Sequence, residues 1–396
     1  KFREVVCVEA CRTPYGRSGG ALKDFSAMEL GALAIKEVLR RTEGKVKPGD
    51  VDYIFMGQVV PAGCGQIPGR QATILAGVPE YVPSITVNKV CSSGIKTIDL
   101  AFQMILLGRA DICIAGGQES MSNCPFVLPD MRWGARMALP NGRVVDSMVY
   151  DGLWDAFYNR HMAIHGSEVA DEFGFNREEQ DEWALMSHQR ACEAIKKGWF
   201  KEEIVPVEIK TKKGPVMFET DEHPRADSNM EALGKLKPAF KKDGLTTAGN
   251  ASIISDGAAA VVVMAEEKAR ALGCTALAAI GAQASAGLDM KYVLVAPILA
   301  VPKCLRKEGL GVQDVDLFEI NEAFSGSTVA VLRELQLDPA KVNVNGGSVA
   351  LGHPIGASGC RVLVTLLHEM IRRNKKTGLA SLCLGGGEAV ALVVRR

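Results

Sequence analysis

The sequence predicts an α/β protein made of two similar halves with a large segment inserted between them. Short runs rich in β-branched residues alternate with longer amphipathic runs, as in proteins whose sheets are covered by helices. A unit of strand, turn, helix and strand occurs twice. The stretch from about residue 121 to 250 breaks this alternation and contains all four tryptophans. Such an irregular insertion favours a loop-rich region that carries binding surfaces.

The regular elements can be assigned in chain order. Residues 4–10 (EVVCVEA) and 53–60 (YIFMGQVV) are predicted strands, and residues 27–41 are a predicted helix capped by Ser26. The insertion contains one clear helix at residues 177–198. Further on, the sequence predicts buried strands at residues 258–265 and 389–396.

The repeated unit begins at two Ser-Gly pairs. Ser93-Gly94 opens a mostly apolar helical run at residues 95–108, and Ser358-Gly359 opens a second one at residues 360–373. Each run is followed by a strand that leads into glycines and a glutamate, DICIAGGQE in the first copy and ASLCLGGGE in the second. Both copies carry chemically capable residues at their turns.

Composition excludes several classes of protein. A chain of 396 residues is expected to form two to three domains. Its formal net charge of zero argues against a nucleic-acid binder or a protein held on an anionic membrane. There is no signal-peptide pattern and no run of about 18 apolar residues. The 11 cysteines are scattered, and CxxC and HExxH motifs are absent, so we expect a cytoplasmic chain without a metal site.

Cys91, in the segment VNKVCSSG, precedes the first repeated helix. Amides at a helix start face an anion and lower the pKa of a nearby thiol, which favours the nucleophilic thiolate. A buried cysteine with no chemical role is almost equally compatible with this sequence context.

Three further motifs can carry chemistry, and each has a simpler explanation. His353 lies in a glycine-rich turn and could act as a base or be an exposed turn residue. Cys383 precedes three glycines and could be a core cysteine. In EINEAFSG, Asn321 or Glu322 could simply cap the helix that follows.

Taken together, these motifs resemble the thiolases, enzymes that cleave or form 3-ketoacyl-CoA by a reversible Claisen reaction. The resemblance covers nearly the whole chain and includes RTPYGRSGG, NKVCSSG, AGGQESMSN, TAGNAS, NEAF, NGGSVALGHPIGASG and CLGGG. It implies a five-layered αβαβα fold. Residues 1–120 with 250–272 would form the N-terminal half, residues 121–249 the loop domain, and residues 273–396 the C-terminal half.

The resemblance also implies roles for individual residues. Cys91 would carry the acyl group, His353 would take its proton, and Cys383 would act as acid and base at the α-carbon. One oxyanion would be bound by His353 with a water held by Asn321, and the other by the backbone N–H groups of Cys91 and Gly385. The positions implied for CoA binding are Leu153, His161, Met162, Arg225, Leu236, Ala248, Ser252, Ala323 and Phe324.

The implied enzyme uses CoA and acyl-CoA as substrates and has no permanently bound cofactor. It would be a homodimer or homotetramer, with a small accessory subunit as an open possibility. Two rival functions remain: a decarboxylating condensing enzyme, which the second cysteine Cys383 disfavours, and an inactive acyl-CoA binder, which the presence of Cys91 and His353 disfavours.

The sequence departs from the family pattern near the acyl group. Short-chain thiolases commonly carry a segment like MGxGPVPA, whereas residues 293–300 here read VLVAPILA. Ala163 follows His161-Met162 where glycine is usual, Arg160 precedes them, and Ile253 follows TAGNAS. These changes suggest a branched, dicarboxylic or aromatic 3-ketoacyl-CoA as substrate. The alternatives are ordinary acetoacetyl-CoA specificity, the changes then being drift, or a subunit that needs a partner.

Overall fold

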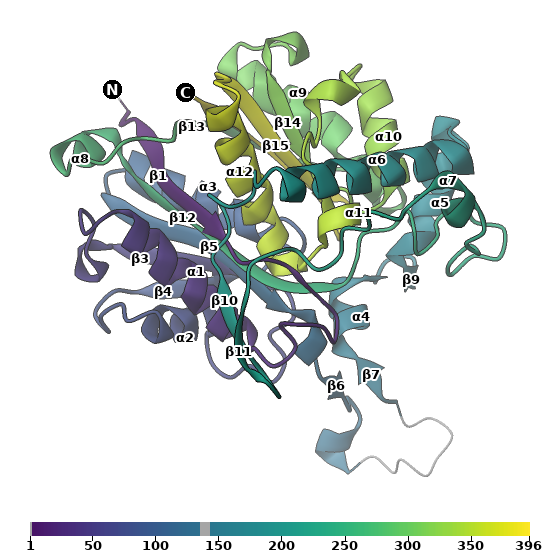
Figure 1. The fold of residues 1–396 in the computed structure, drawn as a ribbon, viewed down its shortest axis with the longest axis horizontal. Helices are drawn as coiled ribbons and strands as arrows, with labels where there is room; N and C mark the ends of the chain where they lie inside the picture. Colours follow the sequence, from purple (N-terminus) through teal and green to yellow (C-terminus); the bar gives the residue numbers. More distant parts are fainter. Residues whose placement is uncertain (1, 135–142) are drawn as a thin grey trace.

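A computed structural model describes residues 2–134 and 143–396 of the chain. Its centre is a mixed sheet in the order β14-β15-β16-β13-β1-β12-β5-β3-β4, with β2 added beside β12 (Figure 1). The strands of this sheet are β1 (Val5–Arg12), β2 (Gly16–Arg17), β3 (Tyr53–Gly57), β4 (Ser84–Val87), β5 (Ile112–Ser120), β12 (Ser255–Ala265), β13 (Ala278–Gly287), β14 (Leu317–Ile320), β15 (Thr377–Leu384) and β16 (Glu388–Arg395).

The sheet consists of two parts that meet along a very short seam. In the first part β3 lies between β4 and β5 and is parallel to both. Strand β12 lies between β5 and β1 and is antiparallel to both. In the second part β14 and β15 are parallel, and β16 pairs antiparallel with β15 and β13. Within residues 2–134 and 143–396, the strands of the two parts pair only where Val6 and Cys7 lie opposite Ala279 and Ala278. The two predicted halves thus share one continuous sheet, which the sequence pattern did not predict.

Helices cover the sheet in layers. The helices are α1 (Ala27–Arg41), α2 (Pro68–Leu75), α3 (Ser93–Leu106), α4 (Ser147–Gly152), α5 (Met162–Phe173), α6 (Arg177–Lys196), α7 (Met230–Gly234), α8 (Glu266–Ala271), α9 (Pro297–Glu308), α10 (Ser325–Glu334), α11 (Ser348–Leu351) and α12 (Ile355–Arg372). The central apolar core combines α3 and α12 with both parts of the sheet. A second core lies under α1 and α2, and a third under α9 and α10. This packing gives the αβαβα arrangement.

The insertion between β5 and β12 lies beside these layers. It contains α4 to α7 and the short two-stranded sheets β6 (Phe126–Val127) with β7 (Val145–Asp146), β8 (Trp154–Asp155) with β9 (Arg160–His161), and β10 (Val207–Thr211) with β11 (Gly214–Phe218). All 11 cysteines of the chain are free thiols. Among the described residues, no helix has both the length and the apolar character that crossing a bilayer requires.

Local sequence explains where the helices begin. Ser26 Oγ accepts a hydrogen bond from Glu29 N at 3.2 Å, and the Glu29 carboxylate accepts one from Ser26 N at 2.8 Å, so the predicted cap of α1 is confirmed as a capping box. Helix α12 starts at Ile355, three residues before the predicted Ser358. Its first turn, IGAS, is rich in small residues, which allow close packing, although Gly356 and Ser358 favour a helix less than alanine does.

The two central helices cross at a pair of glycines. A Cβ atom added to Gly94 would lie 2.5 Å from Cys360 N, and one added to Gly359 would lie 2.5 Å from Ile95 N. The two backbones therefore touch directly, with no room for a side chain. This contact brings the start of α3 against the first turns of α12.

We expect Gly94→Ala to lower the free energy of unfolding by about 1–3 kcal/mol, because the new methyl group would force the helices apart. Urea denaturation at matched protein concentration measures the effect. Gly234→Ala is the control: it lies at the end of α7 with open space around its Cα, and alanine there should be neutral or slightly stabilising. Equal stability of the Gly94→Ala variant and the parent chain would contradict the crossing.

Candidate active site

Loops from both parts of the fold converge on a small cavity of about 60 Å³. Cys91 precedes α3, His353 precedes α12, and Cys383 with Gly385 lies at the end of β15; all four residues line this cavity. Asn321 follows β14, and its Nδ2 lies 3.4 Å from His353 Nε2. The structure thus brings together the five residues for which the sequence predicts a catalytic role.

Cys91 is held on a strained turn and has a raised pKa. Val90 adopts a left-handed conformation with φ of 45°, and Ser93 Oγ accepts a hydrogen bond from Lys89 N at 2.9 Å. Burial raises the pKa of the Cys91 thiol to about 12, although the backbone amides of Cys91 and Gly385 act in the opposite direction. The amides thus act on this pKa in the predicted direction, but the predicted net lowering is wrong, because desolvation outweighs the amides.

The hydrogen bonds of His353 fix its tautomer. Ser358 Oγ donates to Pro354 O at 2.9 Å, so it must accept from His353 Nδ1–H, which lies 2.6 Å away. Nε2 is then the unprotonated nitrogen, and it faces Asn321. Burial, followed by the nearby Arg361 charge, lowers the pKa of His353 to about 3. The imidazole is therefore neutral and able to accept a proton at Nε2.

Asn321 is oriented by a chain of hydrogen bonds. Ser348 Oγ donates to Asn321 Oδ1 at 2.6 Å, and Arg361 Nη2 donates to Ser348 Oγ at 3.2 Å. The carbonyl side of the amide is thereby occupied, and the N–H₂ group points to His353. Sequence reasoning missed Ser348 and Ser358. It also missed Arg361, which is buried in the structure; the available signal was an arginine in a mostly apolar helical run directly after the glycine-rich turn.

Glu322 does not cap the helix that follows it. It is buried and accepts hydrogen bonds from Trp183 Nε1 at 2.9 Å and from Val349 N at 3.1 Å. Helix α10 begins at Ser325, and Phe324 precedes it without a side-chain cap. The simpler explanation of this motif, that Asn321 or Glu322 caps α10, is therefore wrong.

Cys383 is a second buried thiol on the same cavity. Burial, and secondly the Cys91 thiol, raise the pKa of Cys383 well above its usual range. The turn after it needs glycine: Gly386 and Gly387 have φ of 94° and 79°, and a Cβ on Gly387 would lie 2.5 Å from Leu288 O. The site thus contains two neutral thiols beside a neutral imidazole.

Two larger cavities lead outward from the small one. A middle cavity of about 190 Å³, the passage, shares the lining residues His161, Ser252 and Phe324 with the small cavity. A wide cleft of about 850 Å³ shares Ala248 and Ser252 with the passage. All nine predicted CoA-binding positions line these three connected spaces. Leu153, His161, Met162, Ala323 and Phe324 lie at the inner end, Ala248 and Ser252 in the passage, and Arg225 and Leu236 in the wide cleft.

The residues that depart from the family pattern divide into two groups. Val293 and Leu294 line the small cavity, and Ile253 lines the passage. Arg160 does not line these cavities; its guanidinium pairs with Glu168 at 2.7 Å. Only part of the altered sequence can therefore contact a bound acyl group.

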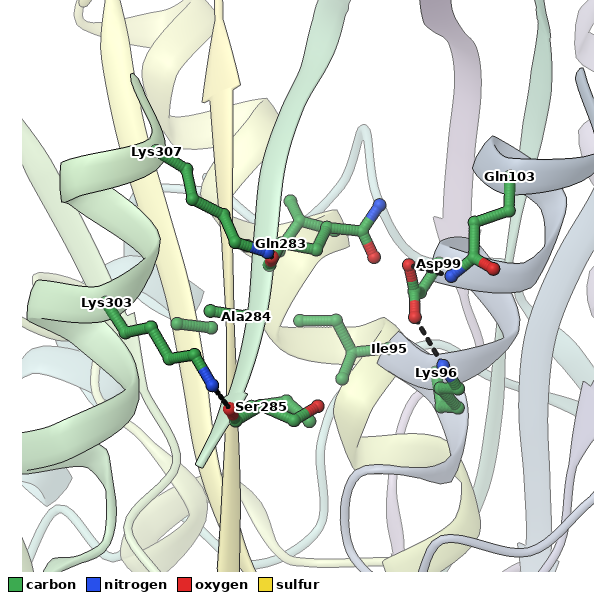
Figure 2. A pocket seen from close by; sticks show the side chains of 12 residues that line it. Ile95, Lys96, Asp99, Gln103, Gln283, Ala284, Ser285, Lys303 and Lys307 are labelled. Carbon is green, nitrogen blue, oxygen red and sulfur yellow. Dashed lines mark hydrogen bonds and ion pairs between the residues drawn. The ribbon is translucent and has the colours of Figure 1, made fainter. Parts of the chain in front are cut away.

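Figure 2 shows a further pocket of about 230 Å³, which has no lining residue in common with the three connected spaces. Lys303 and Lys307 of α9 donate to the carbonyl oxygens of Ser285 and Gln283 at 2.8 and 2.7 Å, and Lys96 pairs with Asp99. The cations of this pocket are thus already engaged with the chain.

Comparisons with known proteins agree with this geometry. The family model for the thiolase N-terminal domain matches residues 5–267, and that for the thiolase C-terminal domain matches residues 274–396. The chain is 52% identical to an acetyl-CoA acetyltransferase of Pseudomonas aeruginosa over the full length of both proteins.

Two solved structures have the same fold. The acetyl-CoA acetyltransferase of Bacillus anthracis is 43% identical, with a TM-score of 0.96 over 100% of this chain and 99% of its own. Human mitochondrial 3-ketoacyl-CoA thiolase is 38% identical, also with a TM-score of 0.96, over 99% of this chain and 98% of its own. With both family models matched in order and relatives aligned from end to end, the chain belongs to the thiolase family.

Proposed function

We propose that this chain, an acyltransferase of the thiolase family, is a short-chain thiolase that interconverts acetoacetyl-CoA plus CoA with two acetyl-CoA. The observation that supports this best is the size of the inner cavity, about 60 Å³, which suits an acetyl or similarly small group. The Pseudomonas aeruginosa relative, named an acetyl-CoA acetyltransferase, favours the same substrate.

The first half of the reaction begins with two neutral groups. Cys91 Sγ attacks the C3 carbonyl of acetoacetyl-CoA while its proton moves to His353 Nε2, and the resulting alkoxide is stabilised by the N–H groups of Cys91 and Gly385. The C2–C3 bond then breaks. The electron pair becomes the enolate of acetyl-CoA, whose oxygen is stabilised by protonated His353 and by Asn321 through a water. Cys383 gives its proton to the α-carbon, and acetyl-Cys91 remains.

The second half returns every group to its starting state. The Cys383 thiolate takes the proton from the incoming CoA thiol, and the CoA sulfur attacks the thioester of acetyl-Cys91. The tetrahedral alkoxide occupies the same pair of backbone N–H groups. As it collapses, Cys91 leaves and recovers its proton from His353. Each of the two thiols thus releases and recovers one proton in a cycle.

A bulkier acyl substrate is the second candidate, suggested by the altered segment at residues 293–300. Leu294 stands where the family pattern has glycine and adds bulk at the wall of the inner cavity, which argues for a smaller acyl group and not for a larger one, although Val293 is smaller than the methionine of the pattern. A cytoplasmic location, assembly as a homodimer or homotetramer, a degradative role and a need for an accessory subunit all stay predictions.

Replacement of each cysteine separates the two chemical roles. Cys91→Ala should abolish turnover and labelling by radioactive acetyl-CoA, because no sulfur is left to carry the acetyl group. Cys383→Ala should lower thiolysis by at least about 10³-fold yet still permit slow acetyl transfer to Cys91, because protonation of the carbon needs an acid whereas CoA can depart as a thiolate. Cys124→Ala, outside the proposed proton path, is the control. Full thiolysis in either catalytic variant would refute the assignment.

Substrate preference can be tested on a panel of 3-ketoacyl-CoA esters of increasing chain length. We expect kcat/KM to be highest for acetoacetyl-CoA and to fall at least about tenfold for six-carbon and longer chains, since the inner cavity is small. Leu294→Ala should reduce this difference by removing bulk from the cavity wall. Leu299→Ala, an exposed position on α9, is the control. Higher kcat/KM for the long, dicarboxylic or aromatic esters would favour the second candidate.

The raised pKa of Cys91 predicts a specific pH dependence in the absence of substrate. Below a pKa of about 12 the thiolate fraction increases tenfold for each pH unit, so alkylation of Cys91 by iodoacetamide should accelerate steadily from pH 6 to 9. Mass spectrometry of the Cys91 peptide measures the rate. A rate that is already constant below pH 8 would show that the helix start dominates after all.

A further inference from the structure

Glu119, at the end of β5, is a buried carboxylate with three hydrogen-bond donors. Its oxygens accept from the backbone amides of Val59, Val60 and Gly356 at 2.9, 3.2 and 2.9 Å. No salt bridge to Glu119 occurs within residues 2–134 and 143–396. Burial raises its pKa to about 7, and the three amides oppose this shift. Such a group is costly to bury, which makes its placement informative.

The three amides come from the two different parts of the fold. Val59 and Val60 follow β3, whereas Gly356 lies in the first turn of α12, three residues after His353. A negative carboxylate at the start of α12 is favoured by the helix dipole. Glu119 thus joins the loop after β3 directly to the turn that carries the imidazole.

The loop after β3 is connected in turn to the nucleophile. Asn88 Nδ2 donates to Val59 O at 3.1 Å, and Asn88 Oδ1 accepts from Val90 N at 3.0 Å. Val90 is the strained residue immediately before Cys91. A continuous path of hydrogen bonds and backbone therefore runs from Cys91 through Asn88 and Glu119 to the His353 turn.

Close backbone contacts leave little freedom at this junction. A Cβ on Gly117 would lie 2.1 Å from Gly356 O, and a Cβ on Gly356 would lie 2.6 Å from Gln118 O. The end of β5 and the start of α12 thus touch. The hydrogen bond from Gly356 N to Glu119 lies at this contact, and the bonds from Val59 N and Val60 N tie the loop after β3 to the same carboxylate.

We propose that Glu119 is a positioning residue that holds Cys91 and His353, from the two parts of the fold, at the separation and orientation that the reaction needs. This inference rests on the proposed roles of those two residues. It predicts that loss of Glu119 lowers the rate of the chemical step but leaves the binding of CoA unchanged, because Glu119 does not line the passage or the wide cleft.

The test compares Glu119→Ala with Glu119→Gln. Alanine removes all three bonds, and kcat per active site should fall at least about 30-fold, with the KM for CoA within about twofold of the parent value. Glutamine keeps one oxygen, which can still accept from both Val59 and Gly356, so it should restore kcat to within about fivefold of the parent. The single-turnover rate of acetyl transfer from acetyl-CoA to Cys91 should fall in parallel with kcat.

Asp256→Ala is the matched control. Asp256 is a buried carboxylate on the neighbouring strand β12, and it accepts from Ser122 N at 2.9 Å and from Ser122 Oγ, just after the end of β5 and not in the C-terminal part of the fold. We expect Asp256→Ala to lower the Tm as much as Glu119→Ala does, but to leave kcat within about twofold of the parent value. The native fraction of each variant, measured by circular dichroism at the assay temperature, gives the concentration of folded enzyme, so that kcat refers to folded enzyme only.

Three outcomes would overturn the proposal: a kcat for Glu119→Ala within about twofold of the parent, an equal loss of kcat in Asp256→Ala at equal loss of Tm, or a rise in KM for CoA with kcat unchanged. Failure of the proposed function would show itself differently, as turnover by Cys91→Ala in the same assay, and would overturn the positioning role as well.

Discussion

The contact between the backbones of α3 and α12 at Gly94 and Gly359 is the constraint on which the site depends. Both helices start beside it, and Cys91 and His353 lie immediately before those starts. Helix packing, which is stiff, therefore limits the range of their separation. The price is a run of small residues with modest helix propensity at the start of α12.

Burial determines the chemistry that this geometry can support. The same desolvation that raises the pKa of both thiols lowers that of His353, so these three groups are uncharged near neutral pH. Charge develops only when a substrate carbonyl is present to receive it. The donors proposed to stabilise that charge are the backbone N–H groups of Cys91 and Gly385, and Asn321, which is held by Ser348. Preorganised donors of this kind need little reorganisation during reaction.

Much of the architecture could be predicted from the sequence because its signals are local. Alternating strand and helix patterns located β1, α1 and α6, and the Ser26 cap was visible as a residue pattern. The seam between β1 and β13 could not be predicted, because a pairing of two residues leaves no periodic signal. Whether Asn321 caps a helix or faces His353 depends on contacts with Ser348, 27 positions away, and the pKa of Cys91 depends on burial by distant segments. In these places tertiary contacts override local propensity.

The sequence separation between α3 and α12 has a consequence for the way the protein is made. The apolar face of α3, with Ile98 and Ile105, is covered in the finished molecule by a helix that is synthesised about 260 residues later. At typical rates of translation, that face waits for its partner for tens of seconds. During this interval the apolar face of the first part of the fold is exposed to solvent. A growing chain of this design needs either help from chaperones or a temporary cover from its own insertion.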